Sequence, residues 1–108
     1  MGRRALGEFE QAVLLAILRL GLNAYGVPIR HDLTDRLGRR VSVGAIYTAL
    51  ERLEAKGFVS SWTGGATAER GGRAKRFYRI EAPGVRALDE ARAATMKLWA
   101  GMPEGAPA

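Results

Sequence analysis

The segment from Arg70 to Ile80 carries side chains suited to holding a polyanion. Five of its residues are cationic and none is acidic: Arg70, Arg73, Lys75, Arg76 and Arg79. Like charges this close together repel one another in free solution, and a phosphate backbone relieves that repulsion. A run of solvated surface charges is the simpler interpretation of the same residues. The segment that precedes it helps to decide between this interpretation and phosphate binding.

A helical pattern over residues 43–56 precedes this basic segment. Its inward face is apolar, with Val43, Ile46, Leu50 and Leu53 in line and Tyr47 at the edge. The outward face is short-chained and polar: Gly44, Ala45, Thr48, Ala49 and Arg52. Small side chains let a helix approach the floor of a DNA major groove, although Gly44 at the helix start could also have no function. Together the two segments predict a DNA-reading helix beside a cationic wing that contacts phosphates.

Catalysis and metal binding are the least favoured kinds of function. The chain has no cysteine and one histidine, His31, so it offers neither a thiolate zinc site nor a histidine cluster, and we expect no metal and no cofactor. No Ser, His and acid arrangement stands out. Gly71 and Gly72 do not form a phosphate loop, because Lys75 is not followed by Ser or Thr.

Length and charge limit the alternatives further. The 108 residues suffice for one domain, and the net charge of +6 suits nucleic acid or an acidic membrane surface. The apolar run from Ala12 to Leu18 follows Arg3 and Arg4, but intervening glutamates and Arg19 make it a poor signal peptide. No apolar stretch reaches the ~20 residues that span a bilayer, so we expect a cytoplasmic protein without membrane attachment.

Three helices are predicted before the basic segment. The first, Glu8 to Leu20, is apolar around almost its whole circumference, so it needs cover from the domain and from a second copy of the chain. The second, Gly26 to Leu37, ends at Gly38 and points Val27, Leu33, Leu37 and either Ile29 or Arg30 inward. Ser42 caps the third helix, which Gly57 ends. The short link between the last two is typical of a helix-turn-helix.

The remainder of the pattern predicts a hairpin and a last helix. Residues Phe58, Val59 and Trp62 pair with Phe77, Tyr78 and Ile80 across a loop from Thr63 to Gly72. A helix then runs from Pro83 to about Met102 with an apolar flank: Val85, Leu88, Ala91, Thr95, Leu98, Trp99 and Met102. This flank has no obvious partner in so small a domain, so we expect it to pair with its counterpart or with the first helix in a dimer.

The fold class predicted by these elements is mainly α with a small β-hairpin. A winged helix-turn-helix domain occupies residues 1–81, with its first helix also taking part in dimerisation. A C-terminal dimerisation helix follows over 82–102, and a flexible tail over 103–108.

The sequence resembles the PadR family of bacterial transcriptional regulators over residues 6–99. The resemblance lies in five short stretches: Leu6 to Glu10; Ala24 to Gly26; Val41, Ser42, Gly44, Ile46, Tyr47, Leu50, Arg52, Leu53 and Gly57; Glu69 to Tyr78; and Ala82 to Gly84. It implies a winged helix-turn-helix that dimerises through its C-terminal helix and first helix. It also implies binding to a roughly palindromic promoter site, usually as a repressor relieved by a ligand. The chain is similar to the short branch, with a single C-terminal helix.

The resemblance also implies which residues contact DNA. Carried over by position, the contacts are Ser42, Gly44, Tyr47, Thr48, Arg52, Arg73, Lys75 and Arg76. Phe77 departs from the family, which often has Tyr there, so a phosphate contact at this position is in doubt. Tyr47 has two interpretations, a core residue or a phosphate contact, and both hold if the ring packs while its hydroxyl stays wet.

The expected dimer interface comprises apolar residues of the first and last helices: Phe9, Leu14, Leu18, Leu88, Thr95, Leu98 and Trp99. A candidate pocket for a small hydrophobic or aromatic effector lies at Met96, Trp99 and Met102, where Trp99 is otherwise simply interface core. The main alternative function is a winged-helix module that binds protein or RNA without promoter specificity. Large apolar residues on the outward face of helix 43–56 would favour that alternative, and the sequence has small and polar ones.

Overall fold

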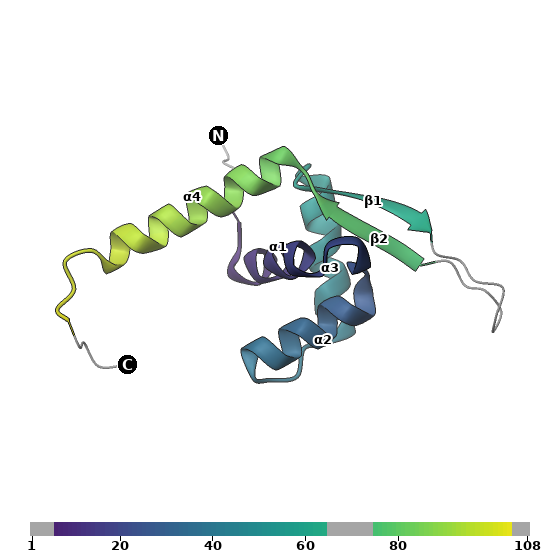
Figure 1. Ribbon diagram of the computed structural model, residues 1–108, viewed down its shortest axis with the longest axis horizontal. Helices are drawn as coiled ribbons and strands as arrows, with labels where there is room; N and C mark the ends of the chain where they lie inside the picture. Colours follow the sequence, from purple (N-terminus) through teal and green to yellow (C-terminus); the bar gives the residue numbers. More distant parts are fainter. Residues whose placement is uncertain (1–5, 65–74, 105–108) are drawn as a thin grey trace.

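The computed structural model describes residues 6–64 and 75–104 and is mainly helical, with one antiparallel hairpin and a C-terminal helix (Figure 1). The elements in chain order are α1 (Glu8–Leu20), the 3-10 turn η1 (Gly21–Asn23), α2 (Gly26–Leu37), α3 (Val43–Ala55), β1 (Val59–Gly64), β2 (Lys75–Ile80) and α4 (Ala82–Trp99). The predicted fold class is confirmed. The bounds of α1 and α2 are those predicted, and α3 ends one residue before Lys56.

Local side-chain and glycine chemistry sets the helix ends. The Gly7 amide donates a hydrogen bond to Glu10 Oε1 at 3.1 Å, which satisfies a free N–H at the start of α1. Ser42 caps α3 as predicted, because its Oγ accepts a hydrogen bond from the Ala45 amide at 3.1 Å. Gly38 ends α2 in the left-handed region, with φ of 67°.

The core lies between the first three helices and the inner face of the hairpin. Its largest fully buried side chains come from α1, α2, α3 and the turn before α3: Leu14, Ile29, Leu33, Ile46, Leu50, Leu53, Val13 and Val41. Ile29, and not Arg30, is the inward residue of α2. Arg30 lies at the edge, where its Nε donates to the Val41 carbonyl at 2.8 Å and braces the turn between α2 and α3.

Four predictions of side-chain direction are wrong. Val27, Leu37 and Val43 were expected inward, but they are 63%, 41% and 48% exposed, because each lies in the first or last turn of its helix, where neighbouring elements cover only part of the side chain. Ala49 was expected on the outward face of α3 and is buried at 4% exposure. Its position follows from α1, which packs against α3 and extends the buried arc beyond the apolar stripe.

The hairpin is joined to the helices along one edge. β1 and β2 are antiparallel, with Ser61 opposite Tyr78 and Trp62 opposite Phe77. The Tyr78 amide donates to the Ala24 carbonyl at 2.9 Å, and Tyr25 forms a bridge with Phe77. The predicted loop began at Thr63, but Thr63 and Gly64 extend β1. Arg70 and Arg73 lie outside the described residues, as do positions 105–108 of the predicted tail.

Helix α4 starts against the hairpin and then projects away from the body (Figure 1). Gly84 allows this start, because a Cβ there would overlap the Phe58 carbonyl oxygen and lie 2.8 Å from Ile80 Cγ1. Beyond Leu88 every described residue of α4 except the half-buried Ala91 is exposed. The helix ends at Trp99 rather than Met102. No helix in the described part of the chain is both long and apolar enough to cross a membrane.

Candidate nucleic-acid interface

The outward face of α3 is open and carries mostly short side chains. Gly44, Ala45 and Thr48 are exposed, and a Cβ built at Gly44 would meet no atom within 4 Å. The Ser42 hydroxyl sits at the start of this face and keeps its own proton available for donation, since its oxygen is the acceptor in the cap. The geometry lets the first two turns of α3 enter a major groove.

Tyr47 packs against α2 and also reaches solvent. A Cβ at Gly26 would overlap the Tyr47 hydroxyl and lie 3.0 Å from Cζ, so the ring rests directly on the glycine. The side chain is nevertheless 46% exposed. Tyr47 therefore packs at the edge of the domain rather than in its core, and its phosphate contact stays a prediction.

Arg52 lies on the other flank of the exposed face. It is exposed one turn beyond Thr48, and its charge helps to lower the pKa of Glu10 in α1. Its contact with DNA stays a prediction.

Two cations of the wing contact the helix-turn-helix. Lys75 Nζ lies 4.6 Å from the ring centroid of Tyr25 and 3.4 Å from its hydroxyl. Arg76 Nη2 lies 3.8 Å from Glu54 Oε2 in α3, and Ser61 Oγ donates to the same oxygen at 2.7 Å. These contacts fix the direction in which the wing leaves the reading helix. The predicted contact Arg73 lies outside the described residues.

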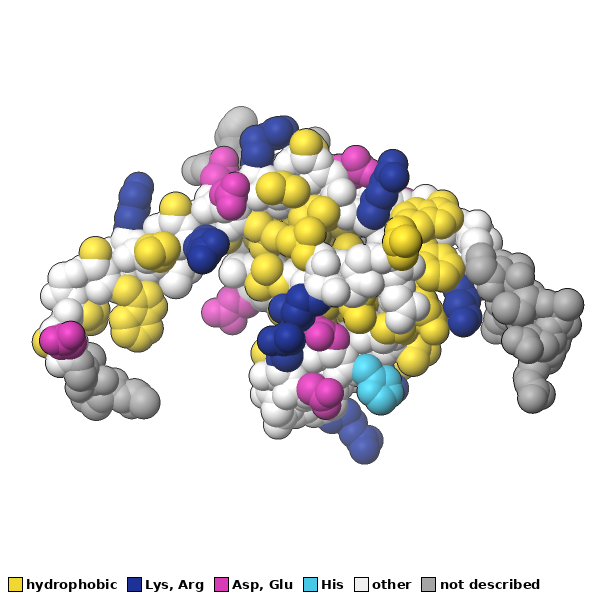
Figure 2. Space-filling view, viewed as in Figure 1, with side chains coloured by type: hydrophobic (Ala, Val, Ile, Leu, Met, Phe, Trp, Pro, Cys, Tyr) yellow, Lys and Arg dark blue, Asp and Glu magenta, His cyan; other side chains and the backbone are white. Residues whose placement is uncertain are grey.

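An aromatic stack forms the outer face of the wing. The Phe77 ring lies edge-on to Tyr25 at 5.3 Å and stacks on Trp62 at 5.7 Å. Hydrophobic side chains accordingly gather around the hairpin in Figure 2. Phe77 thus packs between two rings, which gives a structural role to the position at which the sequence departs from the family pattern.

Residues that the sequence interpretation missed surround the turn between α2 and α3. An open hollow of about 490 Å³ is lined by Arg30, His31, Thr34, Gly38, Arg39 and Arg40. The adjacent pair Arg39 and Arg40 could have indicated a basic site from the sequence alone. The proximity of Arg30 and His31 to this pair could not, because it depends on how α2 is placed. Glu51 was missed too: it is exposed on α3, one turn beyond Thr48 and Tyr47, without a hydrogen-bond or ion-pair partner in the described part of the chain.

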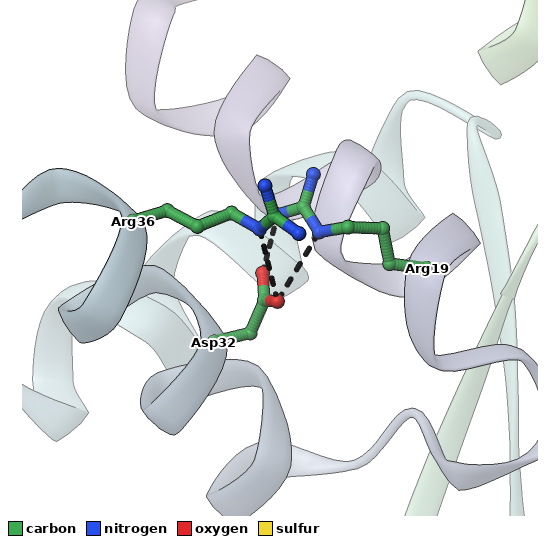
Figure 3. A network of polar contacts seen from close by, with 3 residues as sticks. All are labelled: Arg19, Asp32 and Arg36. Carbon is green, nitrogen blue, oxygen red and sulfur yellow. Dashed lines mark hydrogen bonds and ion pairs between the residues drawn. The ribbon is translucent and has the colours of Figure 1, made fainter.

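An ion-pair network holds α2 on α1 (Figure 3). Asp32 accepts a hydrogen bond from Arg19 Nε at 3.1 Å, with a second from Arg19 Nη2, and another from Arg36 Nε at 3.3 Å. The bonds from Arg19 are the main cause of a lowered pKa at Asp32. Helix α2 therefore has a polar attachment to α1 as well as an apolar one.

The residues expected at the dimer interface fall into two groups. Leu14 and Leu88 are corrected to core residues of the protomer, because they are buried within it and offer no area to a second copy. Leu18, Thr95, Leu98 and Trp99 are exposed, and Phe9 is half-buried. A hollow of about 390 Å³ between α1 and α4 is lined by Phe9, Leu15 and Thr95 among others.

The residues of the predicted effector pocket project from the free end of α4 and the segment after it. Met96, Trp99 and Met102 are 64%, 65% and 54% exposed. Figure 2 shows hydrophobic side chains standing out along this part of the molecule. More than half of each side chain is in water, so the described residues of a single chain do not enclose them.

The open face of α3, its cationic wing and the basic turn before it define a winged helix-turn-helix regulator that binds DNA. A family model described as the transcriptional regulator PadR-like family matches residues 14–90, and the chain belongs to this family. Its members are transcriptional regulators rather than enzymes. Among curated proteins, none has a significant sequence match to this chain.

Solved structures give the same fold. A PadR family transcriptional regulator from Eggerthella lenta is 26% identical, with a TM-score of 0.65 over 84% of this chain and 79% of that one. A transcriptional regulator from Clostridium thermocellum is 20% identical, with a TM-score of 0.69 over 83% and 84%. A PadR-like regulator from Bacillus cereus is 22% identical, with a TM-score of 0.66 over 83% and 82%.

Proposed function

We propose that the protein is a homodimeric repressor that binds a palindromic promoter site and is released from it by a small hydrophobic or aromatic effector. The observation that carries the proposal is the open face of α3 around Gly44 and Thr48, flanked by the basic hollow at Arg39 and Arg40 and by the wing at Lys75 and Arg76. A face of this kind reads base edges while the cations on both sides hold the two phosphate backbones.

The contacts divide by position on this face. We assign base edges to Thr48 and Arg52 on the exposed face of α3, where Gly44 lets the helix approach the groove floor. Ser42, at the start of the helix, and the Tyr47 hydroxyl contact phosphates. Lys75, Arg76 and Arg73 contact the phosphates beside the wing.

Dimerisation is supported by apolar side chains that a single chain leaves in water. On α1 these are Leu15 and Leu18, and on α4 they are Leu98 and Trp99. Burying such residues against a second copy stabilises a dimer by about 25 cal/mol for each Å² removed from water. In this proposal residues 1–81 read DNA, 82–102 dimerise together with α1, and 103–108 form a tail.

Effector binding is placed at the two-fold axis of that dimer. Two copies of Met96, Trp99 and Met102 would meet there and enclose a flat apolar space that one chain lacks. Trp99 serves as interface core in the free dimer and as a stacking partner for the effector. A Trp62→Phe variant makes Trp99 the single tryptophan, so its fluorescence reports effector binding directly.

Selection of bound duplexes from a random pool tests the main proposal. A dimer that neutralises about eight phosphates should show log affinity falling against log salt with a slope near −7. The enriched sequences should be palindromic, with half-sites ~34 Å apart along the duplex. A protein that sediments as a strict monomer and enriches no duplex would contradict the proposal.

A further inference from the structure

A small cleft opens between α2 and α3 on the side of the reading helix. Its volume is about 130 Å³, and it is lined by Gly26, Val27, Arg30, His31, Val43, Ile46 and Tyr47. Its position next to Tyr47 places it against the residues assigned to DNA contacts. Any duplex that reaches Tyr47 from outside therefore also covers this cleft.

The walls of the cleft include exposed apolar side chains at positions where a soluble protein usually has polar ones. Val27 and Val43 are 63% and 48% exposed, although both lie at the starts of their helices, where polar residues are common. Val43 also has a lower helix propensity than most polar alternatives. Neither valine is needed to complete the core, which Ile29 and Ile46 already fill from the same two helices.

The chemistry around the cleft selects a nucleic-acid occupant over a protein side chain. Arg30 and His31 line the cleft and also the basic hollow of Arg39 and Arg40, so the two depressions lie side by side with these residues as a common wall. An apolar group that enters here thus arrives beside phosphates. In the major groove the apolar group presented by a base is the 5-methyl of thymine.

We propose that the cleft formed by Val27, Val43 and Tyr47 binds the 5-methyl group of one thymine in each half-site of the operator. The inference rests on the proposed function, since it names a base that the same reading helix recognises. It makes Val43 a specificity-determining residue, in addition to the polar positions assigned above. Gly26 takes part indirectly, because only a glycine leaves room for the Tyr47 ring that forms one wall.

The test replaces thymine by deoxyuridine, which removes the methyl and keeps every hydrogen-bonding group of the base. In the best duplex enriched from the random pool, each thymine is replaced singly and binding is measured by anisotropy. One position in each half-site should lose about fourfold in affinity, the ratio expected for burying one methyl. Replacement of the thymine in both half-sites should reduce affinity about 15-fold, since the two half-sites contribute independently.

Variants of Val43 distinguish this cleft from other sites of methyl contact. Val43→Thr keeps the shape and makes the wall polar, so the difference between thymine and deoxyuridine should disappear, whereas Val43→Ile should retain it. Leu22→Thr is the control, because Leu22 is an apolar residue of η1 that is 90% exposed and does not line the cleft. It should leave the thymine preference unchanged.

The outcomes separate the inference from the function on which it rests. Tight, selective binding that no deoxyuridine replacement weakens would overturn the inference and leave the regulator intact. A deoxyuridine effect of equal size in wild type and Val43→Thr would also overturn it, since the methyl would then be read elsewhere. Failure to enrich any duplex would overturn both.

Discussion

Glu10 Oε1 accepts a hydrogen bond from Lys56 Nζ at 2.6 Å, which joins the first turn of α1 to the residue that follows α3. Glu10 is the buried charged residue of the described core, at 7% exposure. Burial by itself raises the pKa of this carboxyl, but the bonds from Lys56 and from the Gly7 amide outweigh it, and the pKa lies below the ordinary 4.5. The pair thus attaches the reading helix to the helix that carries exposed Leu18.

The Glu10 pair predicts a loss of stability in acid. A group whose pKa is lowered by folding contributes stability that is complete above its unfolded pKa and is lost as the pH falls through the folded one. Glu10→Gln should therefore reduce the free energy of unfolding by about 2 kcal/mol at pH 7. In urea titrations the difference from wild type should shrink below pH 4. Glu90→Gln, on the exposed side of α4, should show no such convergence.

Gly26→Ala should impair DNA binding more than folding. The added methyl displaces the Tyr47 ring, which is free to swing into solvent because it is half exposed. Affinity for the selected operator should fall about tenfold while the unfolding midpoint in urea stays nearly constant. A double-mutant cycle checks the cause, since Gly26→Ala should have no further effect in a Tyr47→Ala background. Additive losses would mean that the glycine acts through another residue.

Arg76 and Thr48 should respond in opposite ways to substitution. Arg76→Ala removes one phosphate contact from each protomer, so affinity should fall equally for all sequences and the salt slope should decrease by about 2. Its pair with Glu54, at 3.8 Å and exposed, contributes little to the fold. Thr48→Val should instead change the preferred base at one position of each half-site. The reverse pattern, measured by repeating the pool selection, would contradict the assigned roles.

Glu51 is expected to restrict binding rather than strengthen it. A carboxylate without a partner on the DNA-facing helix repels phosphates and is accepted where a base amino group, such as cytosine N4, donates a hydrogen bond to it. Glu51→Gln should increase affinity for random duplex and narrow the ratio between specific and non-specific binding by about tenfold. Anisotropy with both duplexes measures this ratio. Unchanged ratios in Glu51→Gln would place the residue outside the DNA interface.

The apolar pattern predicted the elements well, because helix and strand periods follow directly from backbone geometry. The same pattern was a poorer guide to which side chains point into the core. Ala49 was predicted on the wrong face of α3, since an alanine fits either face and the packing of α1 buries this one. Val27 and Val43 have the spacing of core residues, yet both lie at helix starts where about half or more of the side chain stays exposed.

The candidate site shows the same division. Ser42 and the small face of α3 could be read along one helix, whereas the contact of Gly26 with Tyr47 joins two helices and has no sequence signature. Leu14 and Leu88 were assigned to a dimer because a single sequence does not distinguish a core apolar residue from an interface one. The structure identifies both as core residues, because Leu14 in α1 and Leu88 in α4 are buried within one chain.

The contact between Arg19 and Asp32 links the exposed end of α1 to the middle of α2. Arg19 follows Leu18 directly, and Leu18 is one of the apolar residues that a single chain leaves exposed. Asp32 lies midway along α2, and the Arg30 guanidinium braces the turn that leads from there into α3. The expected dimer contact at Leu18 and the start of the DNA-facing helix are therefore joined through side chains as well as through the backbone.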